Sequence, residues 1–305
     1  KGFAKPQMFM NLFISNAGLI VIGCGMTLVM ITGGIDISVG SVTALVCMSA
    51  AYAMENKGMS AVAAVVISLL IGTLFGIVQG YLVTYLEIQP FIVTLAGMFF
   101  GRGLTAVIST DMIAIQNKTF LKWANYRINL PFGTYNRRGI FIPAYIYPTV
   151  IIALAVVILI TIMLKFTKFG RSLYAIGGNQ QSAVMMGLNV KRTKMKAYVL
   201  DGFLAGLGGF LFCLNSCAGF VEQAKGLEMD AIASAVIGGT LLSGGVGTVI
   251  GTLFGVLING TISSLITTQG TLSSWWVRIT LSALLCFFIV LQAVIAAVKR
   301  KKKKK

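Results

Sequence analysis

The chain has 305 residues, of which 57% are hydrophobic and only 11% are charged. Soluble domains carry about 45–50% apolar and about 25% charged residues, so the composition excludes an ordinary soluble protein and indicates a polytopic membrane protein. The sequence contains no histidine, which is the commonest general base and metal ligand. This disfavours a metal site, and no motif in the sequence indicates catalytic residues or a cofactor, so we expect none of the three.

The net charge of +17 is concentrated in two short stretches. Seven basic and no acidic residues lie within 165–196, and seven more form the tail 299–305. Short basic loops that flank membrane spans mark the cytoplasmic side. We therefore expect both stretches, and the C-terminus, to be cytoplasmic, and we expect no binding to nucleic acid. The lysine tail could also hold anionic lipid headgroups.

Apolar runs predict about nine transmembrane helices, each close to the roughly 20 residues that cross a bilayer. They cover residues 16–33, 39–54, 61–86, 90–108, 144–164, 198–220, 231–248, 249–268 and 275–298. The predicted fold class is an all-α polytopic membrane protein with a single transmembrane domain over residues 1–305. With the C-terminus inside, this count places residue 1 outside, so we expect a tenth span upstream in the full chain.

Residues 33–41, with the sequence GGIDISVGS, interrupt an apolar stretch with glycines, a carboxylate and hydroxyls. A charge near the bilayer centre costs about 3 kcal/mol on insertion scales. A broken membrane helix is tolerated only where it is buried in protein or lines a cavity. We predict that Asp36, Ser38 and Ser41 line a transport route. In a second interpretation, the Asp36 carboxylate is structural and caps the amides of the broken helix.

A second glycine-rich interruption, GGTLLSGGVG, lies at residues 238–247. Paired interruptions in the two halves of a transporter point to its central site, so we predict that Thr240 and Ser243 share the route. A tight turn between two spans is the alternative. The pentapeptide GTLFG occurs at 72–76 and again at 251–255, which indicates an internal pseudo-repeat, although small residues at this spacing also let helices pack closely.

The basic loop 165–197 contains the sequence YAIGGN at 174–179. We predict a turn there, with Asn179 capping a short helix that ends near Gly187. Such a helix would present Ala183, Val184 and Met186 as a small apolar face, which suits docking into a groove of a soluble partner. A solvated loop is the alternative.

Together these motifs resemble the membrane-spanning permease subunits of ribose-type bacterial ABC sugar importers. The segments that carry the resemblance are 33–41, 174–187 and AIASAVIGGT at 231–240. Other segments are most similar to a permease of the galactofuranose importer, with ribose and xylose permeases as alternatives. These segments are TLAGMFF at 94–100, Arg102-Gly103, LLSGGVG at 241–247 and GTLSSWW at 270–276.

The resemblance implies a subunit that does no chemistry itself and lies in the bacterial cytoplasmic (inner) membrane. Two permeases, different chains in the galactofuranose branch, would form the path for a monosaccharide. A cytoplasmic ABC ATPase would bind and hydrolyse ATP, and an extracytoplasmic sugar-binding protein would deliver the sugar. The residues implied in coupling to the ATPase are Gly178, Asn179, Ala183, Met186 and Gly187.

The resemblance has one departure, at Asp201, where relatives tend to carry a small hydroxyl residue. We expect Asp201 to pair with a cation such as Lys196, or to tune coupling, rather than to bind sugar. We expect Arg102 to be paired structurally or to snorkel outward rather than to bind sugar. An ion-coupled secondary transporter is the alternative class, since it would also have repeats and broken helices but would not need a docking loop.

Overall fold

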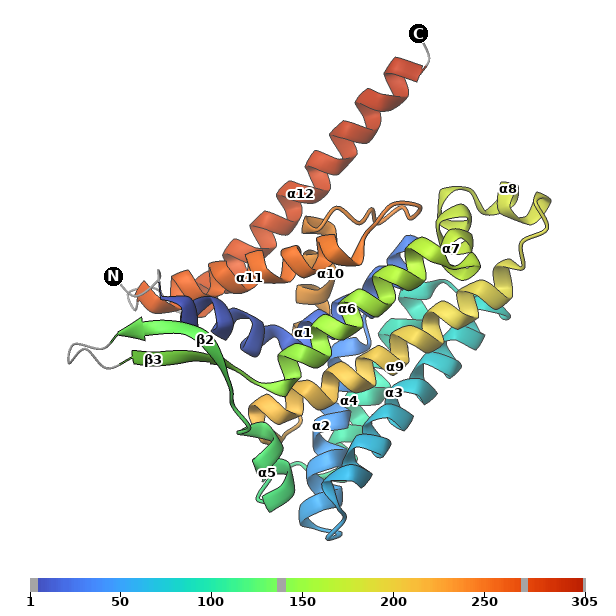
Figure 1. Cartoon of the computed structure of the whole chain (residues 1–305). Coiled ribbons are helices and arrows are strands. Elements are labelled where there is room, and N and C mark those ends of the chain that lie inside the picture. Colours follow the sequence, from blue (N-terminus) through green and yellow to red (C-terminus); the bar gives the residue numbers. More distant parts are fainter. Residues whose placement is uncertain (1–4, 136–140, 270–273, 304–305) are drawn as a thin grey trace.

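The computed structural model describes residues 5–135, 141–269 and 274–303, and within these ranges the chain is mainly helical (Figure 1). The helices are α1 (Pro6–Ile31), α2 (Val39–Glu55), α3 (Ala61–Thr84), α4 (Pro90–Ile108), α5 (Lys118–Ala124), α6 (Pro148–Phe166), α7 (Lys168–Gly178), α8 (Gln180–Met185), α9 (Val190–Ser216), α10 (Leu227–Ile237), α11 (Val249–Gln269) and α12 (Ser274–Lys303). The strands are β1 (Ile113–Ala114), β2 (Ile128–Tyr135), β3 (Phe141–Ile146) and β4 (Ala218–Gly219).

In the described ranges, 7 helices are long and apolar enough to cross a membrane, namely α1, α3, α4, α6, α9, α11 and α12. Helix α2 is apolar but has only 17 residues, and α10 has 11. The predicted span 231–248 is therefore helical only as far as Ile237, because the glycine-rich residues beyond it form a loop. The count of nine spans stays a prediction.

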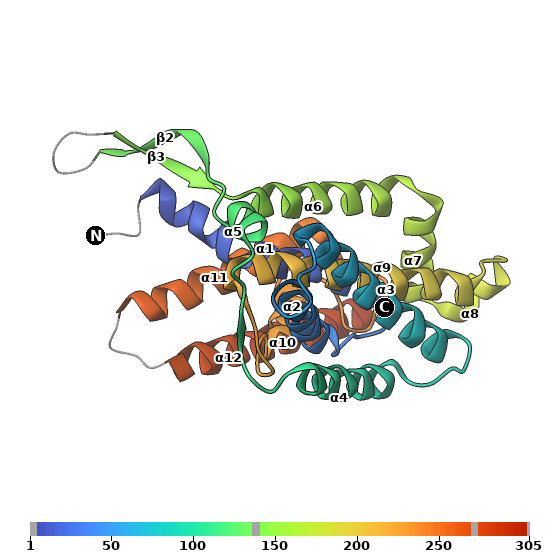
Figure 2. The same cartoon turned by 90° about the horizontal axis from the view of Figure 1, so that it is seen from below.

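Helix α9 lies at the centre of the bundle, packed against α1, α2 and α3 (Figures 1 and 2). Every residue of α1 from Ala17 to Ile31 is buried. A helix that is apolar and buried around its whole circumference belongs in the core of an assembly. Helices α1 and α9 therefore form the core around which the other spans are arranged.

Helix α3 shows the reverse of a soluble protein's burial pattern. Its small residues Gly72 and Gly76 are buried, whereas Leu70 and Leu74 are 55% and 57% exposed. A Cβ added at Gly202 of α9 would lie 2.7 Å from the Cα of Gly76, so the two backbones touch. Close approach of small residues is how helices associate in lipid. The first GTLFG copy thus serves helix packing, and the internal repeat stays a prediction.

The stretch between α4 and α6 contains β-structure, which corrects the all-α prediction. Strands β2 and β3 pair as an antiparallel hairpin, and β1 pairs with β4 after α9. The hairpin docks on the start of α1, because the Gln7 amide donates to the Tyr145 carbonyl (3.2 Å) and accepts from its N–H (2.8 Å). The predicted span 144–164 starts later, at Pro148, because the residues before it belong to β3.

Candidate functional site

Asp36 lies in the non-helical segment between α1 and α2 and is only 3% exposed. Its Oδ1 accepts hydrogen bonds from the Ser38 N–H (2.7 Å) and the Ser38 hydroxyl (2.6 Å). The Ser41 hydroxyl donates to the Ser38 carbonyl (2.7 Å). These bonds satisfy polar groups that the interrupted helix leaves without partners inside the bundle. The geometry agrees with the capping interpretation of Asp36, and a role in a transport route stays a prediction.

Three further polar side chains surround this segment, and the sequence motifs did not point to them as a group. Gln79 of α3 donates its Nε2 hydrogen to the Ser38 hydroxyl (2.8 Å). The Tyr198 hydroxyl of α9 is buried and has no hydrogen-bond partner among the described residues. The carboxyl group of Asp201 lies beside that of Asp36. The one sign of this cluster in the sequence is the amide at Gln79, since an amide inside an apolar span needs a hydrogen-bond partner.

The predicted pairing of Asp201 with Lys196 is wrong. Asp201 is fully buried, and no cation of the described chain lies within ion-pairing distance of it. Lys196 is exposed. Five residues along a helix turn by roughly 140° about its axis, so the two side chains project from different faces of α9.

The second glycine-rich segment, 238–248, crosses the first. The Gly245 N–H donates to the Ile31 carbonyl (2.9 Å), and a Cβ added at Gly33 would lie 3.6 Å from the Ser243 carbonyl oxygen. Gly177 of α7 packs into the same crossing, where an added Cβ would overlap the Ile31 carbonyl oxygen. We call these contacts among residues 31–33, 243–245 and Gly177 the inner crossing.

The five predicted route residues therefore do not all lie together. Asp36, Ser38 and Ser41 share one hydrogen-bonded cluster. Thr240 is fully buried, and its Oγ1 has no partner among the described residues, whereas Ser243 is exposed beside the inner crossing. No hydrogen bond in the described ranges joins the side chains of Thr240 or Ser243 to the Asp36 cluster.

Helix α8 projects from one end of the bundle, as Figure 1 shows. Asn179 accepts a hydrogen bond from the Ser182 N–H (2.9 Å), which confirms the predicted cap. Ala183 is fully buried against Ile176 and Val190, so it anchors the helix and does not belong to an exposed face. Gly187 follows the helix with a left-handed φ of +76°.

The outward surface of α8 is apolar. Val184, Met185 and Met186 are 57%, 86% and 66% exposed. We call these three residues the α8 knob. The predicted turn at 174–179 is wrong, because α7 remains helical through Gly178. The backbone at Gly178 has open space beside it, and the side chain of Asn179 is used in the cap.

Two contacts hold this end of the bundle together. Lys191 at the start of α9 forms an ion pair with Glu87 in the loop after α3 (2.8 Å), and the hydrogen bond and charge of Lys191 lower the pKa of Glu87. The Tyr174 hydroxyl of α7 donates to the Gly247 carbonyl (2.8 Å), and burial raises the pKa of Tyr174. The ion pair is exposed and contributes little on its own, so the partly buried Tyr174 contact is the firmer attachment.

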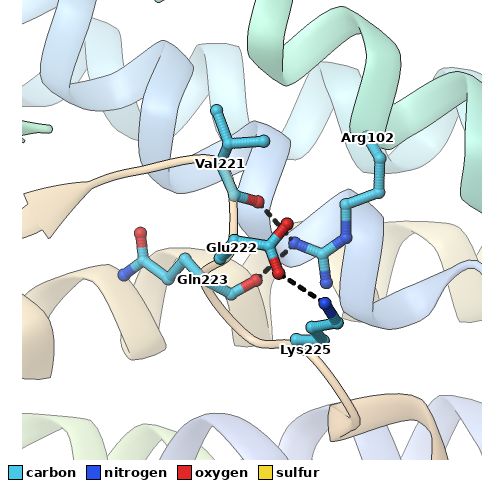
Figure 3. Close-up of polar contacts among 5 residues, drawn as sticks. All are labelled: Arg102, Val221, Glu222, Gln223 and Lys225. Carbon is cyan, nitrogen blue, oxygen red and sulfur yellow. Dashed lines mark hydrogen bonds and ion pairs between the residues drawn. The ribbon is translucent and has the colours of Figure 1, made fainter. Parts of the chain in front are cut away.

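At the opposite end, Arg102 of α4 holds the loop between β4 and α10 (Figure 3). Its Nη1 donates to the carbonyl oxygens of Val221 (2.8 Å) and Gln223 (2.6 Å). Within the loop, Lys225 pairs with Glu222 (2.6 Å), and this pairing lowers the pKa of Glu222. Arg102 is therefore structurally paired, as predicted.

Residues 8–289 match the family model described as "Branched-chain amino acid transport system / permease component". The chain belongs to this permease family. The permease is 42% identical over 291 residues to the inner membrane ABC transporter permease protein YjfF of Escherichia coli, which covers 95% of this chain and 85% of that protein. No solved structure matches.

Two further relatives carry substrate names. The fructose import permease protein FruG of Bifidobacterium longum is 36% identical over 288 residues, covering 94% of the permease and 83% of FruG. The ribose import permease protein RbsC of Bacillus subtilis is 38% identical over 263 residues, covering 86% and 77% of the two chains. The description of the family model is that of a membrane transport component and not of a catalytic enzyme.

Residues 270–273 of the GTLSSWW segment, which is one of the motifs that carried the resemblance, lie outside the described residues of the permease. The side chains of the basic tail 299–305 lie outside them as well. The described part of that segment ends in Trp275 and Trp276, which are 67% and 49% exposed. Exposed tryptophans at the end of a span are typical of the membrane interface.

Proposed function

We propose that the chain is the membrane-spanning permease subunit of an ATP-driven importer of a monosaccharide in the bacterial cytoplasmic membrane. Galactofuranose is the first candidate, because the segments 94–100 and 241–247 resemble a permease of that importer. Ribose and xylose are the alternatives, and the names of the fructose and ribose import permeases support a sugar substrate in general.

The α8 knob is the observation that carries the coupling to an ATPase. Its three apolar side chains stand out of the bundle beyond the basic residues Lys165, Lys168 and Arg171, and so at the end expected in the cytoplasm. An apolar surface that faces neither lipid nor the protein's own core marks a protein interface. Because Ala183 anchors α8 and Asn179 caps it, the knob is held in a shape that fits a groove of a soluble partner.

The proposed assembly contains a cytoplasmic ABC ATPase on the α8 knob, a second permease beside this one and an extracytoplasmic sugar-binding protein at the opposite end. That end carries the β2–β3 hairpin and the loop held by Arg102. We propose a heterodimer of permeases with the C-terminus in the cytoplasm. In this assembly, Asp36, Ser38, Ser41, Thr240 and Ser243 would line or shape the route.

The test is uptake of labelled galactofuranose, ribose, xylose and fructose into proteoliposomes. They would contain the full-length permease, its partner permease and the ATPase, with the binding protein added outside. We expect uptake of one sugar that requires ATP and all the partners. Uptake by this chain alone, driven by an ion gradient, would show a secondary transporter and contradict the proposal.

A variant isolates the role of α8. Met185→Asp places a charge on the most exposed residue of the knob, where it has no packing to disturb, so we expect retention of the ATPase on the purified complex to fall about tenfold or more, a change of about 1.4 kcal/mol. Met112→Asp is the matched control, since Met112 is 64% exposed in the loop after α4 at the opposite end. Equal retention in the two variants would contradict docking on α8.

A further inference from the structure

A cleft of about 300 Å³ with both polar and apolar walls opens between α1 and α11 at the end of the bundle away from α8. Its walls include Ser15 of α1, Asp230 of α10 and Asn259 and Ser264 of α11, with Leu281 of α12 on one side. In Figures 1 and 2, the start of α1 and the end of α11 lie together on the side opposite α8. We call this the outer cleft.

Asn259 is the deepest polar group of the outer cleft and is only 3% exposed. Its Nδ2 donates to the Ser234 hydroxyl (2.9 Å), and the Ser234 hydroxyl donates to the Asp230 carbonyl (2.7 Å). The Asn259 side-chain carbonyl oxygen accepts no hydrogen bond from the described residues. A buried acceptor without a partner costs about 1–3 kcal/mol, so a donor that reaches this buried oxygen from the cleft would be stabilised.

Further polar groups line the cleft above Asn259. The Asp230 carboxylate accepts no hydrogen bond from the described residues, and it lies in the first turn of α10. The hydroxyls of Ser15 and Ser264 also lie in the wall. Gly260 makes room for another amide, because a Cβ there would lie 2.6 Å from the Asn16 Nδ2. The cleft therefore offers both donors and acceptors on three helices.

The chemistry of this wall selects a class of ligand. Polar residues inside membrane-spanning helices are costly and usually face a pathway or a cavity. A single carboxylate with amides and hydroxyls suits a neutral molecule that both donates and accepts. An anion would be repelled by Asp230, and an aliphatic side chain would leave the amides without partners. The cleft volume is at the lower end of small-ligand sites, which run from about 300 to 1,000 Å³.

We propose that the outer cleft is a binding site for a neutral polyhydroxylated solute of monosaccharide size, held by Asn259 and Asp230. This inference rests on the proposed function and adds a place where the sugar binds. The site lies at the end from which a binding protein would deliver sugar, and it is separate from the Asp36 cluster. Open acceptors on a small pocket give weak, reversible binding, which an importer needs because the sugar must leave.

The test is protection of an introduced cysteine from a membrane-impermeant thiol reagent. Ser264→Cys reports on the cleft, and Leu265→Cys is the matched control, since Leu265 is the next residue of α11, is 44% exposed and does not line the cleft. The background carries Cys217→Ser and Cys286→Ser, because the remaining native cysteines, Cys24, Cys47 and Cys213, are buried. The complete complex in lipid nanodiscs is labelled with the thiol reagent in the presence of galactofuranose, ribose, xylose, fructose or leucine, each at increasing concentrations.

We expect one sugar to slow labelling at position 264 about tenfold at about ten times its Kd, without protecting position 265, and leucine to protect neither. Asn259→Leu and the isosteric Asp230→Asn should each weaken the protection. Asp230→Asn keeps the shape of the side chain and guards against a folding defect in Asn259→Leu, and thermal unfolding of both checks the fold.

The outcomes separate this site from the proposed function. A complex that imports sugar with ATP but shows no sugar protection at position 264 overturns the outer cleft and leaves the importer intact. Sugar protection that vanishes in both variants supports the site even in a complex that imports nothing, in which case the importer proposal fails instead. Protection that is unchanged in both variants overturns the assignment to Asn259 and Asp230.

Discussion

Two buried amides, Gln79 of α3 and Asn259 of α11, make the same hydrogen bond in different surroundings. Each donates through its side-chain nitrogen to a serine hydroxyl of a neighbouring segment, Gln79 to Ser38 (2.8 Å) and Asn259 to Ser234 (2.9 Å). Each also leaves its carbonyl oxygen without a partner among the described residues. Both serines have a further acceptor, Asp36 Oδ1 for Ser38 and the Asp230 carbonyl for Ser234.

The surroundings differ in what they offer a solute. Gln79 lies in the wall of a groove of about 500 Å³ whose other lining side chains are all apolar or glycine. Asn259 lies at the bottom of the outer cleft, beside a carboxylate, hydroxyls and a second amide. A polar residue in a membrane span is therefore not evidence of a route by itself. The neighbouring side chains decide whether such a residue bonds only within the protein, as in an apolar groove, or is also available to a ligand in a cleft that contains other polar groups.

We call the Asp36 cluster with Gln79, together with the inner crossing, the closed region. The largest effect is expected at the inner crossing, where backbone atoms are in close contact. Gly177→Ala would push a Cβ into the Ile31 carbonyl oxygen and the Gly245 N–H, which are backbone atoms that cannot turn away. Overpacking of this kind costs about 1–3 kcal/mol, and we expect a clear fall in the thermal unfolding temperature of the purified complex. Gly178→Ala is the matched control, because the space beside Gly178 is open. Equal falls in the two variants would show that the crossing is not tightly packed.

The next effect concerns the carboxylate of the closed region. Asp36→Ala leaves the Ser38 N–H and hydroxyl without their acceptor in a buried segment, which we expect to cost about 1–3 kcal/mol of unfolding free energy. Asp36→Asn retains one acceptor oxygen and should lose less. Denaturation of the detergent-solubilised complex measures both. If Asp36→Ala keeps full stability while sugar uptake collapses, Asp36 is a route residue and its capping role is secondary.

A smaller effect is expected at Arg102, which holds the loop between β4 and α10 at the end of the bundle opposite α8. Arg102→Leu removes the hydrogen bonds to the carbonyls of Val221 and Gln223. Since the guanidinium is partly exposed, we expect a loss of only about 1 kcal/mol, confined to the loop it holds. Limited proteolysis within 217–226 should become faster while the global unfolding temperature changes little. A global loss of stability instead would show that the loop belongs to the cooperative core.

The sequence predicts local features of this protein better than its long-range contacts. Apolar runs locate α3, α4 and α11 to within a few residues because span length is set by the bilayer, and the Asn179 cap follows from a rule that needs only neighbouring residues. The hairpin was missed because residues 141–146 are apolar and adjoin the apolar start of α6, so the strand and the span appear continuous.

The long-range partners needed the structure. Contacts between segments that are far apart in the chain form the surroundings of Asp201 and the inner crossing at Gly177. The hydrogen bonds of Gln79 and Asn259 are also contacts of this kind. An amide within an apolar span indicates that a hydrogen-bond partner exists, but helix packing determines which serine is that partner. For the same reason, GGIDISVGS identified a buried polar segment, whereas the outer cleft, assembled from α1, α10 and α11, has no continuous motif.

The smallest effect on stability is also the sharpest test of the comparison between the two amides. Gln79→Leu places an apolar side chain in an apolar groove, and Ser38 keeps its bond to Asp36, so we expect a change in stability below about 1 kcal/mol. Asn259→Leu should be similar, because Ser234 keeps its bond to the Asp230 carbonyl. Only the second variant removes an acceptor from a polar cavity. We therefore expect sugar protection of Ser264→Cys to survive Gln79→Leu and to be lost in Asn259→Leu, measured side by side with thermal unfolding. If both variants lose protection equally, the amides act through the packing of the whole bundle, and the distinction between a closed and an open region fails.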